Sequence, residues 1–367
     1  MRADEETEIV VPEGGTVRQL LRVRSDGGPV DLGAVDPRST PGLPAAAGEG
    51  KDRKLWARRQ VELIGAGLAR QQEMLFATAT ATAKATAGPK AAAGAKAAGA
   101  KAAAGAKAKA AATTTAAATA TVPAAGARDA HTSAPTRGGS ELGRGRPGRL
   151  LLVLQAMDCG GKDGTVKRVA GAMNPLGLHI RSFGPPTRQE LRHDFLWRIR
   201  RALPPPGYVG IFNRSHYEDV LVARVDALVP EETWRARYDQ INAFERELAD
   251  GDVTVVKVML HISADEQARR LSERLTDPTK YWKYQPSDLD SRARWDDYQA
   301  AYAEALGRCD TDAAPWFLVP ADRKWYRDWA VAHLLRETFE GLDLGYPAAG
   351  FDVERERQRL SSGGGGG

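Results

Sequence analysis

The sequence predicts an α/β fold, a parallel sheet with helices on both faces and a helical lid. Short apolar runs alternate with helical segments through the second half of the chain, and such strands are joined by right-handed crossovers. A glycine turn that carries a lysine joins the first apolar run to a helix. A basic segment interrupted by proline follows the fourth run and is expected to form the lid.

The composition limits the class of protein. The chain has 367 residues and a formal charge of +5, which favours polyanionic partners. Its two cysteines, Cys159 and Cys309, form neither a disulfide framework nor a metal-ligand spacing, which indicates a reducing compartment. The N-terminus is acidic, and no apolar run reaches the roughly 18 residues of a membrane span. We therefore expect a soluble, cytoplasmic protein without a membrane partner.

The first third of the chain combines a predicted helix with a low-complexity segment. Apolar residues at mostly helical spacing predict an amphipathic helix over residues 52–76, and they are Leu55, Val61, Ile64, Leu68 and Leu75. Residues 77–122 are almost only Ala, Thr, Gly and Lys, and they cannot bury enough apolar surface to offset their ordering entropy. We expect a disordered or partly helical linker. The alternative is a basic arm that grips polyanions, weakly including nucleic acid.

These features divide the chain into four parts. Residues 1–76 form an N-terminal extension and the amphipathic helix, and residues 77–147 form a low-complexity insert. Residues 148–345 form the core, and residues 346–367 form a flexible tail. The insert is expected to lie in the loop between the helix and the first core strand.

The core elements follow from their sequence boundaries. Five runs predict strands, at residues 150–157, 178–183, 208–212, 253–262 and 315–320. The first strand is followed by a predicted helix that stops at Asn174 and Pro175. A longer helix is predicted over residues 230–252. Three further helices are each expected to open with a capping box, and the boxes pair Thr187 with Glu190, Ser215 with Glu218 and Ser263 with Glu266.

The first motif, "LQAMDCGGKDGTVKRV", runs from a strand through a glycine turn (residues 156–165) into a helix. A P-loop has the form G-x-x-x-x-G-K-[ST]; its amides bind phosphate, and its lysine reaches the outer phosphates. Gly161 and Lys162 fit this form, whereas Ala156 and Asp163 depart from it. The alternative is an ordinary glycine-rich turn. The predicted phosphate-binding residues are Gly161, Lys162, Asp163, Gly164, Thr165, Lys167 and Arg168.

Asp158 places a carboxylate in a turn that is expected to bind phosphates. Carboxylate and phosphate repel each other unless a divalent cation lies between them, and hard cations take oxygen ligands. We therefore expect Asp158 to be the metal-binding residue. The expected ion is Mg²⁺, with Mn²⁺ as the other candidate.

The second motif, "GIFNRSHYEDV", is again a strand end that enters a capped helix. Arg214 can neutralise charge on a transferring phosphoryl group. Asn213 is also a candidate, and Glu218 and Asp219 could contact a metal or a proton-bearing group. The alternative is simple capping and surface charge. We interpret His216 as a packing or hydrogen-bonding residue, because no second His or Cys accompanies it at metal-ligand spacing.

The third motif is "QARRLSERLTDPTKYWKYQPSDL". Arg270 and Arg274 lie four residues apart on one helix face, and a proline separates them from Lys280 and Lys283. This arrangement suits a lid that closes positive charge over phosphates and excludes water. The alternative is a solvated basic helix. Trp282 is expected to pack rather than to stack on a base.

Taken in order, these motifs closely resemble the family-2 polyphosphate kinases, which are polyphosphate:nucleotide phosphotransferases. The matching text comprises "LQAMDCGGKDGTVKRV", "HDFLWR", "GIFNRSHYEDVLVARV", "RLSERLTDPTKYWKY", "RWDDYQAAYAEAL" and "APWFLVPADRKWYRDW". It extends from Leu151 to Leu342. The segment "VDPRSTPGL" and the helix before the insert are also similar to the family's N-terminal portion. The insert is not part of the family pattern.

The resemblance implies a P-loop kinase-like fold, related to thymidylate kinases. It also implies a Mg²⁺-dependent transfer of the terminal phosphoryl group of inorganic polyphosphate to a nucleoside mono- or diphosphate. On this basis Asp158 and Lys162 bind the metal and the phosphates. Arg214 belongs to the second strand end, and Arg270 and Arg274 belong to the lid. A homo-oligomer is expected.

The chain departs from the family pattern at three places. Cys159 and Gly160 replace the more usual Ala-Ala pair of the turn, and the glycine should loosen it slightly. Gly184 stands where relatives commonly have a lysine that contacts polyphosphate. Asn213 occupies a position that other branches fill with Asp, so the sequence leaves open the nucleotide preference and the number of metal ions.

Two other functions are compatible with the same residues. One is an ATP-dependent nucleoside or small-molecule kinase on the same fold. The other is a non-catalytic polyanion-binding protein that uses the Lys/Ala arm. The presence of Asp158, Lys162 and Arg214, the predicted catalytic residues, speaks against the second alternative. The sequence does not distinguish AMP, ADP and guanine nucleotides as acceptors.

Overall fold

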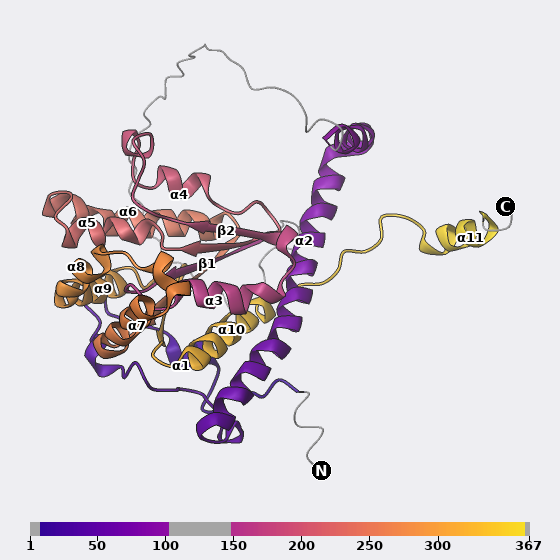
Figure 1. Cartoon of the computed structure of the whole chain (residues 1–367). Helices are drawn as coiled ribbons and strands as arrows, with labels where there is room; N and C mark the ends of the chain where they lie inside the picture. The colour runs from indigo at the N-terminus through magenta and orange to yellow at the C-terminus, as the bar shows by residue number, and fades with distance from the viewer. Residues whose placement is uncertain (1–7, 103–147, 364–367) are drawn as a thin grey trace. The chain divides into compact units, whose positions relative to one another are not determined.

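The structure, a computed structural model, describes residues 8–102 and 148–363. The chain divides into two compact units. One unit comprises residues 1–81 and 146–367, and the other comprises residues 82–145. The sheet, the predicted motifs and the helices that cover the sheet lie in the first unit, except that α2 continues past residue 81 into the second (Figure 1).

Five parallel strands form one sheet in the order β2-β3-β1-β4-β5, as the alternation of strands and helices predicts. The central strand, β1, pairs with β3 along one edge and with β4 along the other, so its backbone groups are hydrogen-bonded on both sides. The strands are β1 (Arg149–Gln155), β2 (Leu178–Ser182), β3 (Val209–Asn213), β4 (Val253–His261) and β5 (Trp316–Pro320). All five lie where the sequence predicts strands.

Helices cover both faces of the sheet, because successive side chains of each strand point to opposite faces. In β1, Leu151 and Val153 belong to one hydrophobic cluster, and Leu150, Leu152 and Leu154 belong to the other. Helices α4 (Trp197–Arg201), α5 (Val222–Val225), α6 (Glu231–Asp250) and α9 (Trp295–Arg308) pack into the first cluster. Helices α1 (Val17–Leu21), α2 (Gly50–Ala102), α3 (Lys162–Val169) and α10 (Lys324–Glu340) pack into the second cluster.

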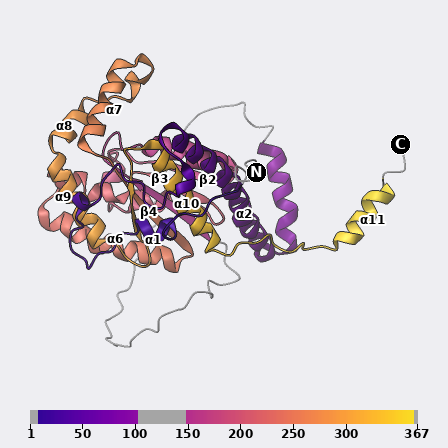
Figure 2. The ribbon, with the colours of Figure 1, turned by 90° about the horizontal axis from the view of Figure 1, so that it is seen from below.

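The remaining elements include the predicted lid, which comprises α7 (Ala264–Thr276), η7 (Pro278–Lys283) and α8 (Ser287–Ala293). Figure 2 shows α7 and α8 standing apart from the helices that cover the sheet. Short 3-10 helices occur at η1 (Leu32–Ala34), η2 (Ala45–Ala47), η3 (Ala170–Ala172), η4 (Pro175–Gly177), η5 (Glu190–Arg192) and η6 (His216–Asp219).

The prediction of three helices that open with capping boxes is only partly correct. The reciprocal bonds form between Thr187 and Glu190, but only the short 3-10 helix η5 follows, and its own N-cap residue, Gln189, makes no side-chain cap bond. Because η5 buries no side chain, it gains no packing for further turns. At Ser215 and Ser263 the hydroxyl accepts a helix amide as predicted. The glutamates that would complete these boxes bind arginines instead, Glu218 among them.

The N-terminal segment covers the outer edge of β5. The amide of Val23 donates to the carbonyl of Trp316 at 2.9 Å, and Arg22 forms an isolated antiparallel bridge with Phe317. Arg22 also pairs with Asp310 at 3.3 Å, behind the same strand. The edge strand is therefore partly paired by chain from more than 280 residues earlier in the sequence.

The helix predicted over residues 52–76 is longer than expected. Helix α2 begins at Gly50 and continues to Ala102, so the first part of the expected insert is helical, while residues 103–147 lie outside the described residues. The tail that was expected to be flexible contains a helix, α11 (Val353–Gly363). No helix among residues 8–102 and 148–363 combines the length and the apolar character needed to cross a membrane.

Candidate active site

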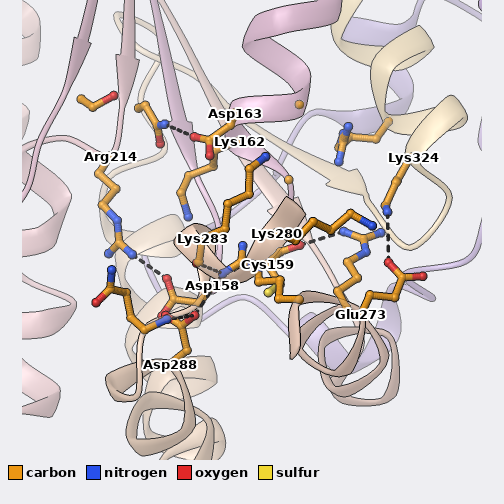
Figure 3. A pocket seen from close by; sticks show the side chains of 18 of the residues that line it. Asp158, Cys159, Lys162, Asp163, Arg214, Glu273, Lys280, Lys283, Asp288 and Lys324 are labelled. Atoms are coloured by element: carbon orange, nitrogen blue, oxygen red, sulfur yellow. Dashed lines mark hydrogen bonds and ion pairs between the residues drawn. The ribbon is translucent and has the colours of Figure 1, made fainter. Parts of the chain in front are cut away.

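A basic cavity of about 470 Å³ lies at the carboxyl ends of the strands, where the glycine turn, the β3 end and the lid meet (Figure 3). Its lining contains nine basic and four acidic side chains. The basic side chains are those of Lys162, Arg168, Arg214, Arg270, Arg274, Lys280, Lys283, Lys324 and Arg327. A cavity with this charge suits a ligand with several negative charges.

The glycine turn has an unusual backbone that is fixed by its surroundings. Cys159 and Gly161 both have left-handed φ angles, 63° and 106°, and Gly161 is the N-cap of α3. A Cβ atom at Gly161 would lie 1.7 Å from a guanidinium nitrogen of Arg327, so only glycine fits there. The first turn of α3 therefore presents its amides to the cavity with a guanidinium packed against the loop.

Lys162 lies beneath the turn and is only 9% exposed. Its ammonium group donates to the carbonyl of Ala156 at 2.7 Å, and the contact to the carbonyl of Met157 is longer, at 3.5 Å. Burial, and secondarily the charge of Arg214, lower the pKa of Lys162 to about 8. An incoming phosphate would stabilise the charged form further, because it adds negative charge close to the ammonium group.

Asp158 and Arg214 form the central ion pair of the cavity. The guanidinium of Arg214 contacts Asp158 at 2.6 Å and Glu218 at 2.8 Å, and the first contact is marked in Figure 3. The charges of Glu218 and Asp158 raise the pKa of Arg214 despite its burial. Arg214 has a left-handed φ of 63°, and its amide donates to the carbonyl of Leu154, which joins the ends of β3 and β1.

A buried polar cluster fixes the segment behind Arg214. Lys257 on β4 is fully buried and donates to Glu245 at 2.6 Å and to the hydroxyl of Tyr217 at 2.8 Å. His216 contacts the same Glu245 carboxylate at 3.1 Å. The interpretation of His216 as a hydrogen-bonding residue therefore agrees with its contacts. Because every charge in this cluster has a partner, the cluster stabilises the turn that carries Arg214.

Asn213 and Asp163 link the second motif to the first. The amide nitrogen of Asn213 donates to the Asp163 carboxylate at 2.6 Å. A carboxylate at position 213 would instead place two negative charges side by side at this point. Asn213 is therefore a suitable neighbour for Asp163, which stands where the P-loop motif has a serine or threonine.

Arg270 lies on the lid helix α7, but its guanidinium is bonded within the protein. It is 5% exposed, and all five of its N–H donors are directed to protein oxygens. It therefore ties the first lid helix to the glycine turn and to the loop after β5, and it has no donor left for a substrate. The acceptors are the Glu266 carboxylate and the carbonyls of Cys159, Gly160, Ala321 and Asp322.

The other predicted lid residues face the cavity. Arg274 pairs with Asp288 at 3.0 Å, across the lid. Lys280 pairs with Asp277 at 2.9 Å, and the ammonium group of Lys283 lies 5.0 Å from the ring centre of the exposed Trp282. The expected packing of Trp282 is thus not found, since its ring is 74% exposed. The contacts of the two lysines of η7 therefore lie at the protein surface.

The acidic groups of the cavity fit one divalent cation. Asp288 lies close enough to Asp158 for its pKa to be raised, first by burial and then by the Asp158 charge. The ion pair with Arg214 uses only one Asp158 oxygen, Oδ1. Within the described part of the chain no cluster of three or more His, Cys, Asp or Glu side chains could hold a metal by itself. Mg²⁺ is commonly held by one or two carboxylates with water and substrate phosphates, so these residues suffice.

Several predicted residues lie outside the cavity. Thr165 is fully buried, and Lys167 lines a neighbouring cavity together with the shared residue Arg168. Asp219 pairs with Arg198 at 3.6 Å and with Arg237 at 3.3 Å. Burial raises the pKa of Asp219 although both arginines oppose this.

Sequence reasoning missed Arg327, Lys324 and Asp288. Arg327 is 2% exposed, pairs with Asp328 at 2.7 Å and packs on the glycine turn. Lys324 contacts Glu273 at 3.9 Å. Both basic residues follow the end of β5, so the strand-end rule that found the first two motifs could have found them in "PADRKWYRDW". Asp288 has no such signal, since it lies on the lid helix α8 and follows no strand end.

Comparison with known proteins gives consistent results. Residues 142–344 match the family model described as "Polyphosphate kinase 2 (PPK2)". An AMP/ADP-polyphosphate phosphotransferase of Meiothermus ruber is 53% identical over 199 residues, which is 54% of this chain and 74% of that protein. An ADP-polyphosphate phosphotransferase of Rhodopseudomonas palustris is 41% identical over 210 residues, 54% of this chain and 73% of that protein. The crystal structure of polyphosphate kinase 2 from Arthrobacter aurescens TC1 superposes with a TM-score of 0.73 at 38% identity, over 95% of this chain and 97% of that chain.

Proposed function

The chain belongs to the polyphosphate kinase 2 family and is a polyphosphate:nucleotide phosphotransferase, and we propose that the basic cavity is where it transfers the phosphoryl group. The proposed catalytic residues are Asp158, Lys162 and Arg214. The observation that carries this proposal is their convergence, since Arg214 contacts Asp158 at 2.6 Å beside the turn that buries Lys162. The ATP-dependent kinase and the non-catalytic alternative are both less consistent with family membership.

In this proposal the acceptor's terminal phosphate oxygen attacks the end phosphorus of polyphosphate. The bond from that phosphorus to the bridging oxygen breaks, and the shortened polyphosphate leaves with the bonding electrons. Such transition states need position and positive charge more than covalent help. Lys162, Arg214 and the amides of residues 161–165 supply both. Removal of one preorganised donor of this kind costs about 3 kcal/mol in barrier height.

Asp158 and Asp288 are the residues that would hold Mg²⁺. When bound, the ion would offset the repulsion between these carboxylates and the phosphates. Arg274, which contacts Asp288 at 3.0 Å, would fix the orientation of that carboxylate. Asp158 would keep its contact with Arg214 through one oxygen.

The lid is proposed to close over the bound phosphates. Lys280, Lys283 and Arg274 line the cavity from η7 and from the end of α7. Closure would exclude water, which would otherwise compete as the acceptor. Arg270 would act as the fixed base of this movement, because four of its five donors bind carbonyls outside the lid.

We propose AMP and ADP as the acceptors. The support is that the relative with 53% identity is named for both nucleotides, and the relative with 41% identity for ADP. A relative named as a putative GDP-polyphosphate phosphotransferase is less similar, at 32% identity.

We also propose a cytoplasmic homo-oligomer. Cys159 and Cys309 are buried free thiols, which suits a reducing compartment. Sedimentation equilibrium of the purified chain measures the mass of the assembly, and a mass equal to one chain would contradict the proposal.

The experiment that tests the function mixes the purified chain with polyphosphate, Mg²⁺ and one nucleotide at a time, and separates the products by anion-exchange chromatography. We expect ADP from AMP and ATP from ADP. Asp158→Asn keeps the size of the side chain and removes its charge, so it should fold normally and lose transfer by at least about a hundredfold. Transfer from ATP but not from polyphosphate, or full activity of Asp158→Asn, would contradict the proposal.

A further inference from the structure

Gln155 is the last residue of β1 and immediately precedes the glycine turn. Its side chain is fully buried and lies against the segment that follows β3. A buried amide needs hydrogen-bond partners, because an unmatched polar group costs free energy in the core. The partners of Gln155 belong to the second motif, the one that carries Arg214.

The orientation of the Gln155 amide follows from its neighbours. The side-chain nitrogen faces the Glu218 carboxylate at 3.0 Å, and the side-chain oxygen faces the amide and the hydroxyl of Ser215, both at 3.1 Å. The reverse orientation would place the oxygen against a carboxylate and the nitrogen against an N–H donor, so it is less favourable. Gln155 therefore donates to Glu218 and accepts from Ser215.

Both oxygens of Glu218 are engaged in this arrangement. Oε1 accepts from Gln155, and Oε2 accepts from the guanidinium of Arg214 at 2.8 Å. A carboxylate bonded through one oxygen can rotate about its last bond, whereas one bonded through both oxygens keeps a single orientation. This geometry suits a group that orients Arg214 better than it suits a metal ligand.

The contacts form a closed ring at the carboxyl end of β1. Arg214 continues from Glu218 to Asp158, with a contact of 2.6 Å (Figure 3). Asp158 lies three residues after Gln155, so the chain itself closes the ring. The side chains are buried at Gln155, 13% exposed at Glu218 and 34% exposed at Arg214. The buried end is fixed by the sheet, and it fixes the guanidinium at the exposed end in turn.

Arg214 needs a fixed position to act on a phosphoryl group. Its left-handed φ of 63° is a conformation that non-glycine residues keep only where the surroundings impose it. In the described part of the chain, its guanidinium bonds protein through two of its five N–H donors, so three remain for a ligand. A displacement of about 1 Å in such a group can lower a rate about a hundredfold. The contribution of Arg214 therefore depends on the direction in which Glu218 holds it.

We propose that Gln155 is a positioning residue of the phosphoryl transfer and that it fixes Arg214 through Glu218. The proposal rests on the proposed function and adds a residue that does not touch the substrate. Neither Gln155 nor Glu218 is among the described residues that line the basic cavity. Their effect on the reaction is therefore transmitted by Arg214.

The test measures initial rates of transfer from polyphosphate to ADP in the full-length protein. Gln155→Met keeps the length of the side chain and removes the amide, so kcat should fall about twentyfold while KM for ADP stays within about twofold. Gln72→Met is the matched control, because Gln72 is 1% exposed and makes two hydrogen bonds with the backbone of Asn174, outside the cavity. Both variants should lose a similar few degrees in thermal midpoint, but kcat of the control should stay within about twofold.

A second comparison exchanges the two groups. Glu218→Gln places an amide beside the amide of Gln155, so one bond at position 218 is lost and kcat should fall about fiftyfold. In Gln155→Glu/Glu218→Gln the amide nitrogen at position 218 can donate to position 155, and its oxygen can accept from Arg214. We expect kcat of this exchanged pair to recover at least about fivefold relative to Glu218→Gln. A role in stability alone would not restore kcat.

The outcomes separate the positioning role from the proposed function. A kcat of Gln155→Met within about twofold of the original, an equal loss of kcat in Gln72→Met, or no recovery in the exchanged pair would overturn the role. If Gln155→Met does not fold, the comparison of the exchanged pair with Glu218→Gln decides. Absence of transfer from polyphosphate in the unchanged protein would instead refute the proposed function.

Discussion

The two sides of the active cavity hold their positive charges in different ways. On the side of the sheet, Lys162 and Arg327 are buried and each is bonded to protein oxygens. On the side of the lid, Lys280 and Lys283 lie on the exposed 3-10 helix η7, and Trp282 beside them is 74% exposed. One wall is therefore ordered before the substrate arrives, and the other must be ordered by it.

This difference predicts that the two sides of the cavity have different roles in the reaction. Charges that are already in place stabilise a transition state without reorganisation, which is the larger contribution to rate. A flexible lysine loses up to about 2 kcal/mol of side-chain freedom when it is fixed, so the lid should contribute mainly to binding and to exclusion of water. The comparison predicts large kcat effects on the sheet side and smaller KM effects on the lid side.

The largest effect is expected for Lys162→Met. The change removes the buried ammonium from beneath the phosphates and should lower kcat about a thousandfold, or by about 4 kcal/mol. The thermal midpoint should not fall, because the folded protein no longer buries a charge at this position. Steady-state rates and calorimetry measure both. A kcat within tenfold of the original would remove the distinction between the two walls.

Arg270→Gln tests whether Arg270 anchors the lid helix to the glycine turn and to the loop after β5. Loss of a buried guanidinium leaves four carbonyls without a donor, and we expect a cost of about 3 kcal/mol, or about 5 to 10 °C in thermal midpoint. The rate should fall about a hundredfold because the glycine turn loses its anchor. Arg269→Gln is the matched variant for stability: its neighbouring guanidinium is 51% exposed, so the midpoint should shift by about 1 °C or less. Equal shifts would show that Arg270 is not an anchor.

The pH dependence of anion binding follows from Lys162. Since its pKa is about 8, its charge is present below pH 8 and lost above it. Affinity for tripolyphosphate should therefore fall about tenfold from pH 7 to pH 9. The sign for stability is opposite, because the buried charge opposes folding and that penalty disappears between about pH 8 and the usual value of 10.5. Titration calorimetry should show proton uptake on binding, which Lys162→Met abolishes.

Lys283→Ala should have a smaller effect on the other wall. The residue is exposed and makes a ring contact at 5.0 Å, so we expect KM for polyphosphate to rise about fivefold with kcat nearly unchanged. Added salt should reduce the difference between the variant and the original protein, because an exposed charge is screened. A kcat loss as large as that of Lys162→Met would show that both walls act in the same way.

Deletion of residues 86–122 should have the smallest effect. The deleted stretch lies outside the family match at 142–344, and the last buried side chain described on α2 is that of Ala79. We expect turnover within about tenfold of the original, since loop length contributes little to stability. Circular dichroism and initial rates would test this, and an unfolded product would show that the stretch is structural.

Much of the fold and half of the site could be predicted because both follow from local patterns. Short apolar runs located all five strands, and the residues at two strand ends located Asp158, Lys162 and Arg214 in one cavity. These inferences need only the periodicity of the strands and the rule that parallel strands end at one edge.

The remaining features depend on contacts between distant segments. Arg270 has the sequence pattern of a surface residue on a basic helix, yet the loop after β5 and the glycine turn surround it with carbonyl oxygens. Asp219 follows a candidate motif but faces Arg198 and Arg237, which come from two other helices. Lys167 lies in the predicted motif, but the direction of its helix face places it in the neighbouring cavity.

The bond between Val23 and Trp316 has a practical consequence for truncated forms of the protein. The outermost strand of an open sheet offers unpaired amides and carbonyls to any extended chain, including the same strand of another molecule. Here the leading segment supplies its own cover, so a shortened form that begins after Val23 would leave Phe317 and its neighbours ready for self-association. The preferred position for a purification tag or a fluorescent fusion is therefore ahead of this intact cover, not in place of it.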